Sequence, residues 1–262
     1  MSDDAFKIDF SESFEHLPNA PIVEAVIHWR ARAVKKLEPD ALLKQLKTKL
    51  PDYPHSQRQQ QIGFETEFNA EGGAMRQHHA WHGFRFESAD KLQVAQYARN
   101  GFVFSRLKPY EDWEKFQAEA QRLWCVYREL AEPSDIQRLG VRFINLIPIQ
   151  PKEVVSLLSL PPRSPQSMKL PIDAFLHQTK FNIPEHPYEL NVIQTIQPPT
   201  PPDQESSGLI LDLDVGMTRP IPLDEMDDEM DDRLLQMRWI KNKAFFSLLT
   251  KAALERFRSD RA

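Results

Sequence analysis

Two long amphipathic segments each follow a series of strand-like segments, and this recurrence limits the folds open to the chain. Between Trp113 and Leu130, and again in residues 223–257, apolar side chains recur every three or four positions. This spacing is typical of a helix with one buried face. Because strands can supply the surface that buries it, the sequence predicts an α+β protein with long helices on one face of antiparallel sheet.

The first half of the chain predicts the order β-α-β-β-β-β-α. Residues 21–30 alternate between apolar and polar side chains, as a half-buried strand does, and residues 39–50 have helical spacing. Four antiparallel strands are expected at residues 62–68, 74–87, 92–98 and 102–107. Asn100-Gly101 is a strong hairpin signal between the last two. The long helix then closes this half before Pro133.

The second half predicts a similar but shorter order. The expected elements are a strand at residues 138–149, a helix at 153–158, strands at 189–196 and 209–217, and a helix at 223–257. We therefore predict two pseudo-repeated halves, residues 17–132 and 133–262, after a polar leader at residues 1–16. Prolines are frequent in residues 161–202, which we expect to contain loops. This arrangement is analogous to the helix-grip and TBP-like folds, an analogy that implies no function.

The composition is that of a globular chain, with 41% hydrophobic and 27% charged residues. The formal net charge of -5 gives no overall attraction to nucleic acid, although a local basic face remains open. Cys125 is the only cysteine, which excludes an internal disulfide and fits a cytoplasmic location. The acidic N-terminus and the lack of an apolar run of about 20 residues predict neither export nor membrane insertion. No glycine-rich phosphate loop is present, and no cofactor is expected.

The segment HHAWH, residues 78–82, is the most conspicuous histidine cluster. On a strand, His78 and His82 share a face about 13 Å apart, whereas His79 points to the other side. This spacing suits no metal without further ligands, so we expect polar strand histidines and no tightly bound zinc.

Asp212 and Asp214 lie on one face of the expected strand LILDLDVG, and leucine and valine occupy its other face. Two carboxylates at this spacing suit Mg²⁺ binding or acid–base catalysis. The alternative, which we favour, is the solvent face of an ordinary half-buried strand. The pair is retained as the candidate for a metal or catalytic site.

Arg142 and Asn145 stand out in the strand at residues 138–149. Asn145 is in register with apolar side chains, so we expect it to be buried and hydrogen-bonded. Arg142 and Glu24 occupy corresponding positions of the first strand of each half. We expect these two side chains to pair across a pseudo-twofold axis.

Four segments resemble a known family. LPNAPIVEAVIHWR (17–30) has two prolines around an Asn-Ala turn, followed by an apolar strand that carries a glutamate. The others are residues 88–116, RLGVRFINLIPI (138–149) and NKAFFSLLTKAALERF (242–257). Together they resemble a sporadically distributed bacterial family of roughly this length, with an N-terminal L-P-N-A-P-I-V-E-A-V signature and no assigned activity. The resemblance implies a bacterial or phage origin and a cytoplasmic setting, but no catalytic residue.

Three functions are open. We favour a non-enzymatic binding protein, possible in a mobile or defence-associated module, because no catalytic signature is present. A metal-dependent hydrolase or phosphotransfer enzyme that uses Asp212 and Asp214 is one alternative, and a nucleic-acid binder with a curved sheet is the other. The candidate binding residues are Trp29, Arg76, His78, Trp81, His82, Arg85, Arg142 and Asn145.

We expect a protein partner or a homo-oligomer, formed through the helical layer. The apolar positions of the last helix, which include Trp239 and Phe246, span more than one narrow face. Aromatic residues and methionine are enriched in interface cores. The alternative is that this broad stripe wraps around the core of a single chain.

Overall fold

The computed structural model describes residues 6–69, 72–150, 153–165, 167, 168, 170, 172–198 and 207–258, with the backbone alone for residues 62–69, 72–79 and 225–228. A large antiparallel sheet and several helices make up the described part. The predicted α+β class is therefore confirmed. No described helix combines the length and the apolar character needed to cross a bilayer.

Nine strands form one sheet in the order β2-β3-β4-β5-β1-β7-β10-β9-β8, and β6 and β11 form a separate pair. The strands are β1 (Ile22–Arg30), β2 (His55–Asn69), β3 (Gly72–Glu87), β4 (Gln93–Ala98), β5 (Gly101–Leu107), β6 (Asp135–Ile136), β7 (Arg138–Ile149), β8 (Leu176–Asn182), β9 (Tyr188–Gln197), β10 (Ser207–Met217) and β11 (Ile221–Pro222). Every pairing in the large sheet is antiparallel.

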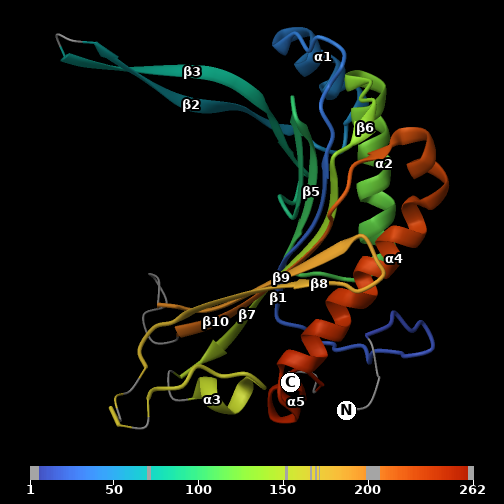
Figure 1. Cartoon of the computed structure of the whole chain (residues 1–262). Coiled ribbons are helices and arrows are strands. Elements are labelled where there is room, and N and C mark those ends of the chain that lie inside the picture. The colour runs from blue at the N-terminus through green and yellow to red at the C-terminus, as the bar shows by residue number, and fades with distance from the viewer. Residues whose placement is uncertain are drawn as a thin grey trace.

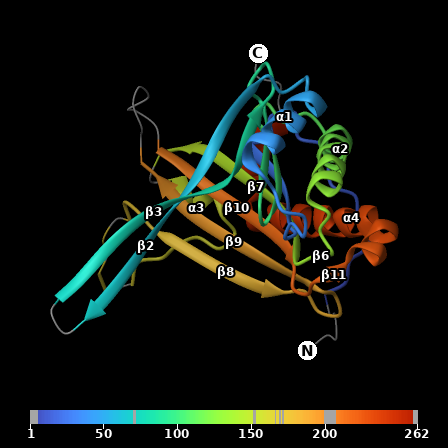
Figure 2. The same ribbon diagram turned by 90° about the horizontal axis from the view of Figure 1, so that it is seen from above.

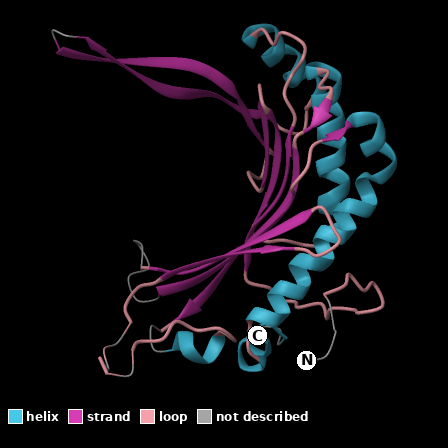
Figure 3. Cartoon of the chain, viewed as in Figure 1, coloured by secondary structure: helices cyan, strands magenta, loops and turns pink. Residues whose placement is uncertain are grey.

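The two long helices lie on the convex side of the curved sheet (Figures 1 and 3). The helices are α1 (Pro39–Lys49), α2 (Trp113–Ala131), α3 (Val154–Leu157), α4 (Leu223–Leu248) and α5 (Lys251–Arg258). No described helix lies across the concave side in these views. We call the sheet surface opposite α2 and α4 the open face.

Helix α2 begins and ends as its sequence predicts. The side chain of Asp112 accepts a hydrogen bond from the backbone N of Lys115 at 2.8 Å, which caps the first turn. At the other end Glu132 has a left-handed backbone, with φ of 47°, and Pro133 follows. Between the ends, Trp124 stacks on Trp29 of β1 with 5.3 Å between ring centroids, so the helix is fixed to the middle of the sheet.

The predicted halves share one sheet and one core. β1, from residues 17–132, pairs directly with β7, from residues 133–262. Buried residues of both halves belong to the same hydrophobic cluster. From this central pair the strand order runs β1-β5-β4-β3-β2 on one side and β7-β10-β9-β8 on the other.

The second half differs from its prediction in its short strands and in its last helix. β8 and β9 lie inside the proline-rich region 161–202, and β6, β8 and β11 were not expected from the sequence. The last helix was expected to be continuous but is interrupted between α4 and α5. There the Oγ1 of Thr250 accepts from the backbone N of Ala253 at 3.2 Å, an N-cap that starts α5 as a separate helix.

β2 and β3 form a long hairpin that projects beyond the rest of the molecule (Figures 1 and 2). β2 pairs with β3 from His55 to Asn69, whereas β4 pairs with β3 only from Gly83 to Glu87. The outer part of the hairpin, which we call the arm, is therefore a ribbon of two strands with both edges unpaired in the described structure.

The N-terminal segment covers the second apolar side of α4. Phe14 stacks on Phe246 with 5.4 Å between ring centroids and meets Trp239 edge to face at 6.0 Å. Phe6 also contacts Trp239, at 5.8 Å. Trp239 is only 5% exposed. The broad apolar stripe of α4 thus wraps around the chain's own core, and the motive for an interface at Trp239 and Phe246 is removed.

Candidate functional site

The open face carries a cluster of charged side chains on its three central strands. Along β1, Ala25, Ile27 and Trp29 are buried on the helical side, so the alternate residues point to the open face. β7 and β10 alternate in the same way. The open-face residues of these strands include Glu24, Val26, His28, Arg138, Arg142, Asp212 and Asp214.

Arg142 and Asp212 form the first ion pair of this cluster. The Nε of Arg142 donates to Oδ1 of Asp212 at 2.8 Å, and its Nη2 donates to Oδ2 at 2.5 Å. The Asp212 side chain is 7% exposed and that of Arg142 is 43% exposed. The hydrogen bonds that Arg142 donates to Asp212 raise the pKa of Arg142, so the guanidinium stays charged and is held in one orientation.

No hydrogen bond or ion pair joins Glu24 to Arg142 in the described structure, although the charge of Glu24 contributes to the raised pKa of Arg142. In the strand register Glu24 lies opposite Ile144, and Arg142 lies opposite Asp214 of β10. Arg142 then reaches diagonally to Asp212, as a long side chain can. Arg142 therefore pairs with the carboxylate of Asp212 on the neighbouring strand, and not with Glu24 as the sequence analysis expected.

Arg138 joins Asp214 to His28. Its Nη2 donates to Oδ2 of Asp214 at 3.0 Å, and its Nη1 faces the Nε2 of His28 within hydrogen-bond reach. Burial, together with the positive charges of Arg138 and Arg142, lowers the pKa of His28 to about 3. His28 is therefore neutral at pH 7, and its Nε2 can accept the hydrogen of the arginine.

Two glycines make room for Arg138. A Cβ atom at Gly140 would lie 2.9 Å from Nη1 of Arg138, and one at Gly216 would lie 2.5 Å from its Cζ. Carbon atoms at these separations overlap, so any side chain at either position would displace the guanidinium. The small residues on β7 and β10 thus belong to the same arrangement as the charged ones.

The cluster is suited to presenting ordered charges rather than to holding a metal. Both carboxylate oxygens of Asp212 and one of Asp214 accept hydrogen bonds from arginines, while Oδ1 of Asp214 is buried without a partner in the described structure. Among the described residues no group of three or more His, Cys, Asp and Glu could hold a metal ion. The two aspartates therefore act as anchors for arginines here.

The tryptophans that the sequence proposed for a binding surface point elsewhere. Trp29 is 1% exposed and lies on the helical side, stacked on Trp124. Trp81 is partly buried and packs against Phe84, with 5.5 Å between ring centroids. Neither ring forms a platform on the open face.

The remaining candidates lie on β3 or in the core. Arg85 pairs with Glu87 through its Nε at 2.9 Å, and His82 is half-buried near the start of the arm. The side chains of Arg76 and His78 lie outside the described part. Asn145 is 1% exposed and donates to the carbonyl oxygen of Leu211 at 2.9 Å, as its register predicted.

Sequence reasoning missed His28 and Arg138. Each is a polar residue on the solvent side of an alternating strand, and such a position does not by itself indicate a functional site. Their only distinguishing context is Gly140 and Gly216, since glycine inside a strand often marks the close approach of another group. The contact depends on the pairing of β1 with β7, which joins residues far apart in the chain.

Comparison with protein-family models finds no match, and comparison with curated proteins finds no relative. The geometry and chemistry of the chain therefore carry the functional proposal.

Proposed function

We propose that the chain is a binding protein that holds a protein partner against the open face. The observation that carries this proposal is that the helices of the described residues all lie on one side of a strongly curved sheet (Figure 3). The other side combines ordered charges with apolar side chains. By strand alternation, its apolar residues are Val26, Val94, Val103, Ile144, Leu146, Ile193 and Ile210.

This mixture of side chains favours a protein partner. Val26 and Val94 are buried although neither belongs to the main core cluster, whereas Ile144 and Ile210 keep part of their surface exposed. Apolar surface rimmed by polar residues is typical of protein interaction sites. Arginine is also enriched in such interfaces, and Arg142 already has its orientation fixed by Asp212.

The arm extends the same surface. A two-stranded hairpin is marginally stable in water unless a third strand or another surface supports it. The unpaired edges of β2 and β3 also offer backbone donors and acceptors that a strand of a partner can use. We infer that the arm closes over the partner or pairs with it.

An internal duplication would account for the curved surface. The strand order on either side of the β1 and β7 pair follows the same path, with one strand fewer in the second half. Each half also ends in a long helix, α2 or α4, on the same side. We propose that the halves arose by duplication. Their joining at the β1 and β7 pair would then produce the curved open face, which is analogous to the saddle-shaped sheet of TBP-like folds.

The two alternative functions have less support. A hydrolase or phosphotransfer enzyme would need Asp212 and Asp214 free to bind a metal, but both are engaged by arginines. A nucleic-acid surface would gain from aromatic rings for stacking, but Trp29 lies in the core. We place the binding function in the cytoplasm, where the exposed thiol of Cys125 would stay reduced.

The proposal is tested by comparing two matched variants in the cells that naturally produce the chain. Ile210→Lys places a charge in the middle of the open face, and Ala118→Lys places the same charge on the exposed surface of α2. A protein that co-purifies with the wild type and with Ala118→Lys, but not with Ile210→Lys, supports the proposal. A partner that is retained by Ile210→Lys and lost with Ala118→Lys contradicts it.

A further inference from the structure

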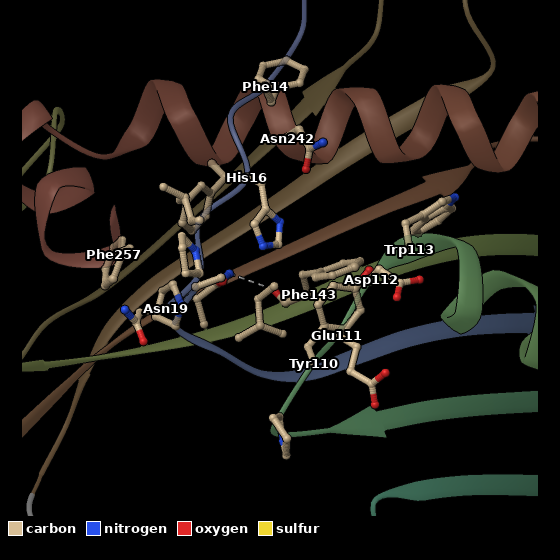
Figure 4. A pocket seen from close by; sticks show the side chains of 18 of the residues that line it. Phe14, His16, Asn19, Tyr110, Glu111, Asp112, Trp113, Phe143, Asn242 and Phe257 are labelled. Atoms are coloured by element: carbon tan, nitrogen blue, oxygen red, sulfur yellow. Dashed lines mark hydrogen bonds between the residues drawn. The ribbon is translucent and has the colours of Figure 1, made fainter. Parts of the chain in front are cut away.

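A second candidate site lies on the helical side of the sheet, away from the open face. It is a cavity of about 550 Å³ between α4, the N-terminal segment 14–23 and the residues that lead into α2 (Figure 4). Phe143 and Asn145 of β7 also line it. Small-molecule sites in proteins have volumes of this order.

Lys241 of α4 lines this cavity, and no carboxylate of the described residues pairs with it. Its Nζ lies 3.9 Å from the centroid of the Phe143 ring, and no hydrogen bond or ion pair to Lys241 exists in the described structure. Burial, and to a smaller extent the charge of Arg238, lowers the pKa of Lys241 to about 7. A buried ammonium without an anion is costly, and an anion from outside the chain would remove this cost.

The carboxylates around the cavity do not neutralise Lys241 because other groups hold them. Three lining carboxylates form ion pairs: Glu15 with Arg258 at 2.5 Å, Glu111 with Lys115 at 2.8 Å, and Glu114 with Arg238 at 3.0 Å. Asp112 caps α2 through the backbone N of Lys115. None of these carboxylates therefore neutralises Lys241.

The rest of the lining is aromatic, aliphatic or polar, and it includes a second lysine, Lys108. Tyr110 contacts Phe143 edge to face at 5.3 Å, and Trp113 lies under the guanidinium of Arg238 at 5.5 Å. Burial raises the pKa of Tyr110, so its hydroxyl stays protonated and can donate a hydrogen bond. Figure 4 shows His16 and Asn242 on the other side of the same space. The lining therefore suits a ligand that has one acidic group and an apolar body.

We propose that this cavity binds a small organic anion, with a carboxylate or phosphate group against Lys241 and an apolar body against Tyr110 and Trp113. This site goes beyond the proposed function, because it uses the opposite side of the sheet. Its failure would leave the binding function of the open face intact, and the reverse also holds.

Isothermal titration calorimetry on the full chain tests the site with three matched probes. Phenylacetate and phenyl phosphate carry the two acidic groups, and phenylacetamide is an uncharged analogue of the first. We expect at least one anion to bind about tenfold or more tightly than phenylacetamide. The stronger anion identifies which acidic group the cavity prefers.

Three substitutions locate the binding. Lys241→Met keeps the length of the side chain and removes its charge, and Lys241→Arg keeps the charge. Lys243→Met is the control, because Lys243 is a half-buried lysine of the same helix that pairs with Glu12 at 2.6 Å. We expect Lys241→Met to lose about tenfold or more in affinity, Lys241→Arg to keep part of it and Lys243→Met to match the wild type.

Circular dichroism first confirms that each variant is folded. Binding of both anions no tighter than that of phenylacetamide, unchanged anion affinity in folded Lys241→Met, or no binding of either anion at millimolar concentration would overturn the proposal. If Lys241→Met does not fold, the affinities of Lys241→Arg and of the wild type for the two anions and for phenylacetamide are compared instead. The proposal would also be overturned if Lys243→Met lost the preference for anions while Lys241→Met kept it.

Discussion

The Nη2 atom of Arg138 lies 3.0 Å from the Oδ2 atom of Asp214 and joins β7 to β10 across the open face. Gly140 and Gly216 leave the space in which the guanidinium lies. These contacts therefore fix the charged side chains of the open face within the chain itself. Surfaces whose side chains are already fixed lose less conformational entropy on binding, which suits a recognition role.

His28 should make the stability of the chain depend on pH. Its pKa is lowered from 6.5 to about 3 in the folded state. Between these values the unfolded chain binds a proton that the folded chain does not, so the free energy of unfolding falls as the pH falls from 6.5 to 3. The slope from this group is at most about 1.4 kcal/mol per pH unit.

Urea denaturation at pH values across this window measures the effect. His28→Gln keeps an acceptor for Arg138 but cannot titrate, so its free energy of unfolding should fall less steeply with acid than that of the wild type. His55→Gln, at an exposed position, should keep the wild-type slope. Identical slopes for His28→Gln and the wild type would show that His28 does not titrate as described.

Arg142→Met should destabilise the chain by about 2 kcal/mol, because it leaves the buried carboxylate of Asp212 without its partner. Arg142→Met combined with Asp212→Leu should cost less than the sum of the two single changes. Lys115→Met, which removes an exposed pair with Glu111, should lower the free energy of unfolding much less than Arg142→Met does, because solvent screens this pair. Urea denaturation gives all four values. Strict additivity of the two open-face changes would contradict the account of the pair.

Gly216→Ala should displace the guanidinium of Arg138 and cost about 1 kcal/mol, because the end of the arginine can move but then loses its hydrogen bond to Asp214. Removing the obstructed side chain should remove much of this effect, so Gly216→Ala should be nearly neutral in an Arg138→Ala background. Thermal unfolding of the four proteins measures the coupling. An equal cost of Gly216→Ala in both backgrounds would mean that Arg138 does not occupy this space.

Phe14→Ala should destabilise the chain by about 1–2 kcal/mol and expose part of Trp239 and Phe246. Light scattering should then show more self-association than in the wild type, because apolar surface of α4 is uncovered. The control is Phe10→Ala, since Phe10 is 55% exposed and should cost less than about 0.5 kcal/mol. If both variants behave alike, the N-terminal segment does not cover α4.

Periodicity was sufficient to predict the strands and helices that bury one face. β1, β7 and β10 alternate over most of their length, α2 has helical spacing, and each packs against the common core. β8 escaped prediction because it is an edge strand with an exposed or half-buried side chain at every position. Hydrophobic spacing carries no information about such a strand.

The candidate site could be predicted only in part. Asp212, Asp214 and Arg142 were recognised as charged groups on alternating strands. Their true partners depend on register between strands that are distant in sequence, which composition and spacing do not encode. Lys241 was missed because a lysine in an amphipathic helix is indistinguishable from a solvent-facing one until the N-terminal segment and α2 enclose it.

Site-specific photo-crosslinking tests the central claim, partner binding on the open face, most directly. A photoreactive phenylalanine analogue replaces Ile210 on the open face in one variant and Ala118 on the exposed surface of α2 in the other. After irradiation in the cells that produce the chain, mass spectrometry identifies any crosslinked protein. The account predicts one predominant partner at position 210 and none at position 118. The same partner at position 118, with no crosslink at position 210, would contradict it.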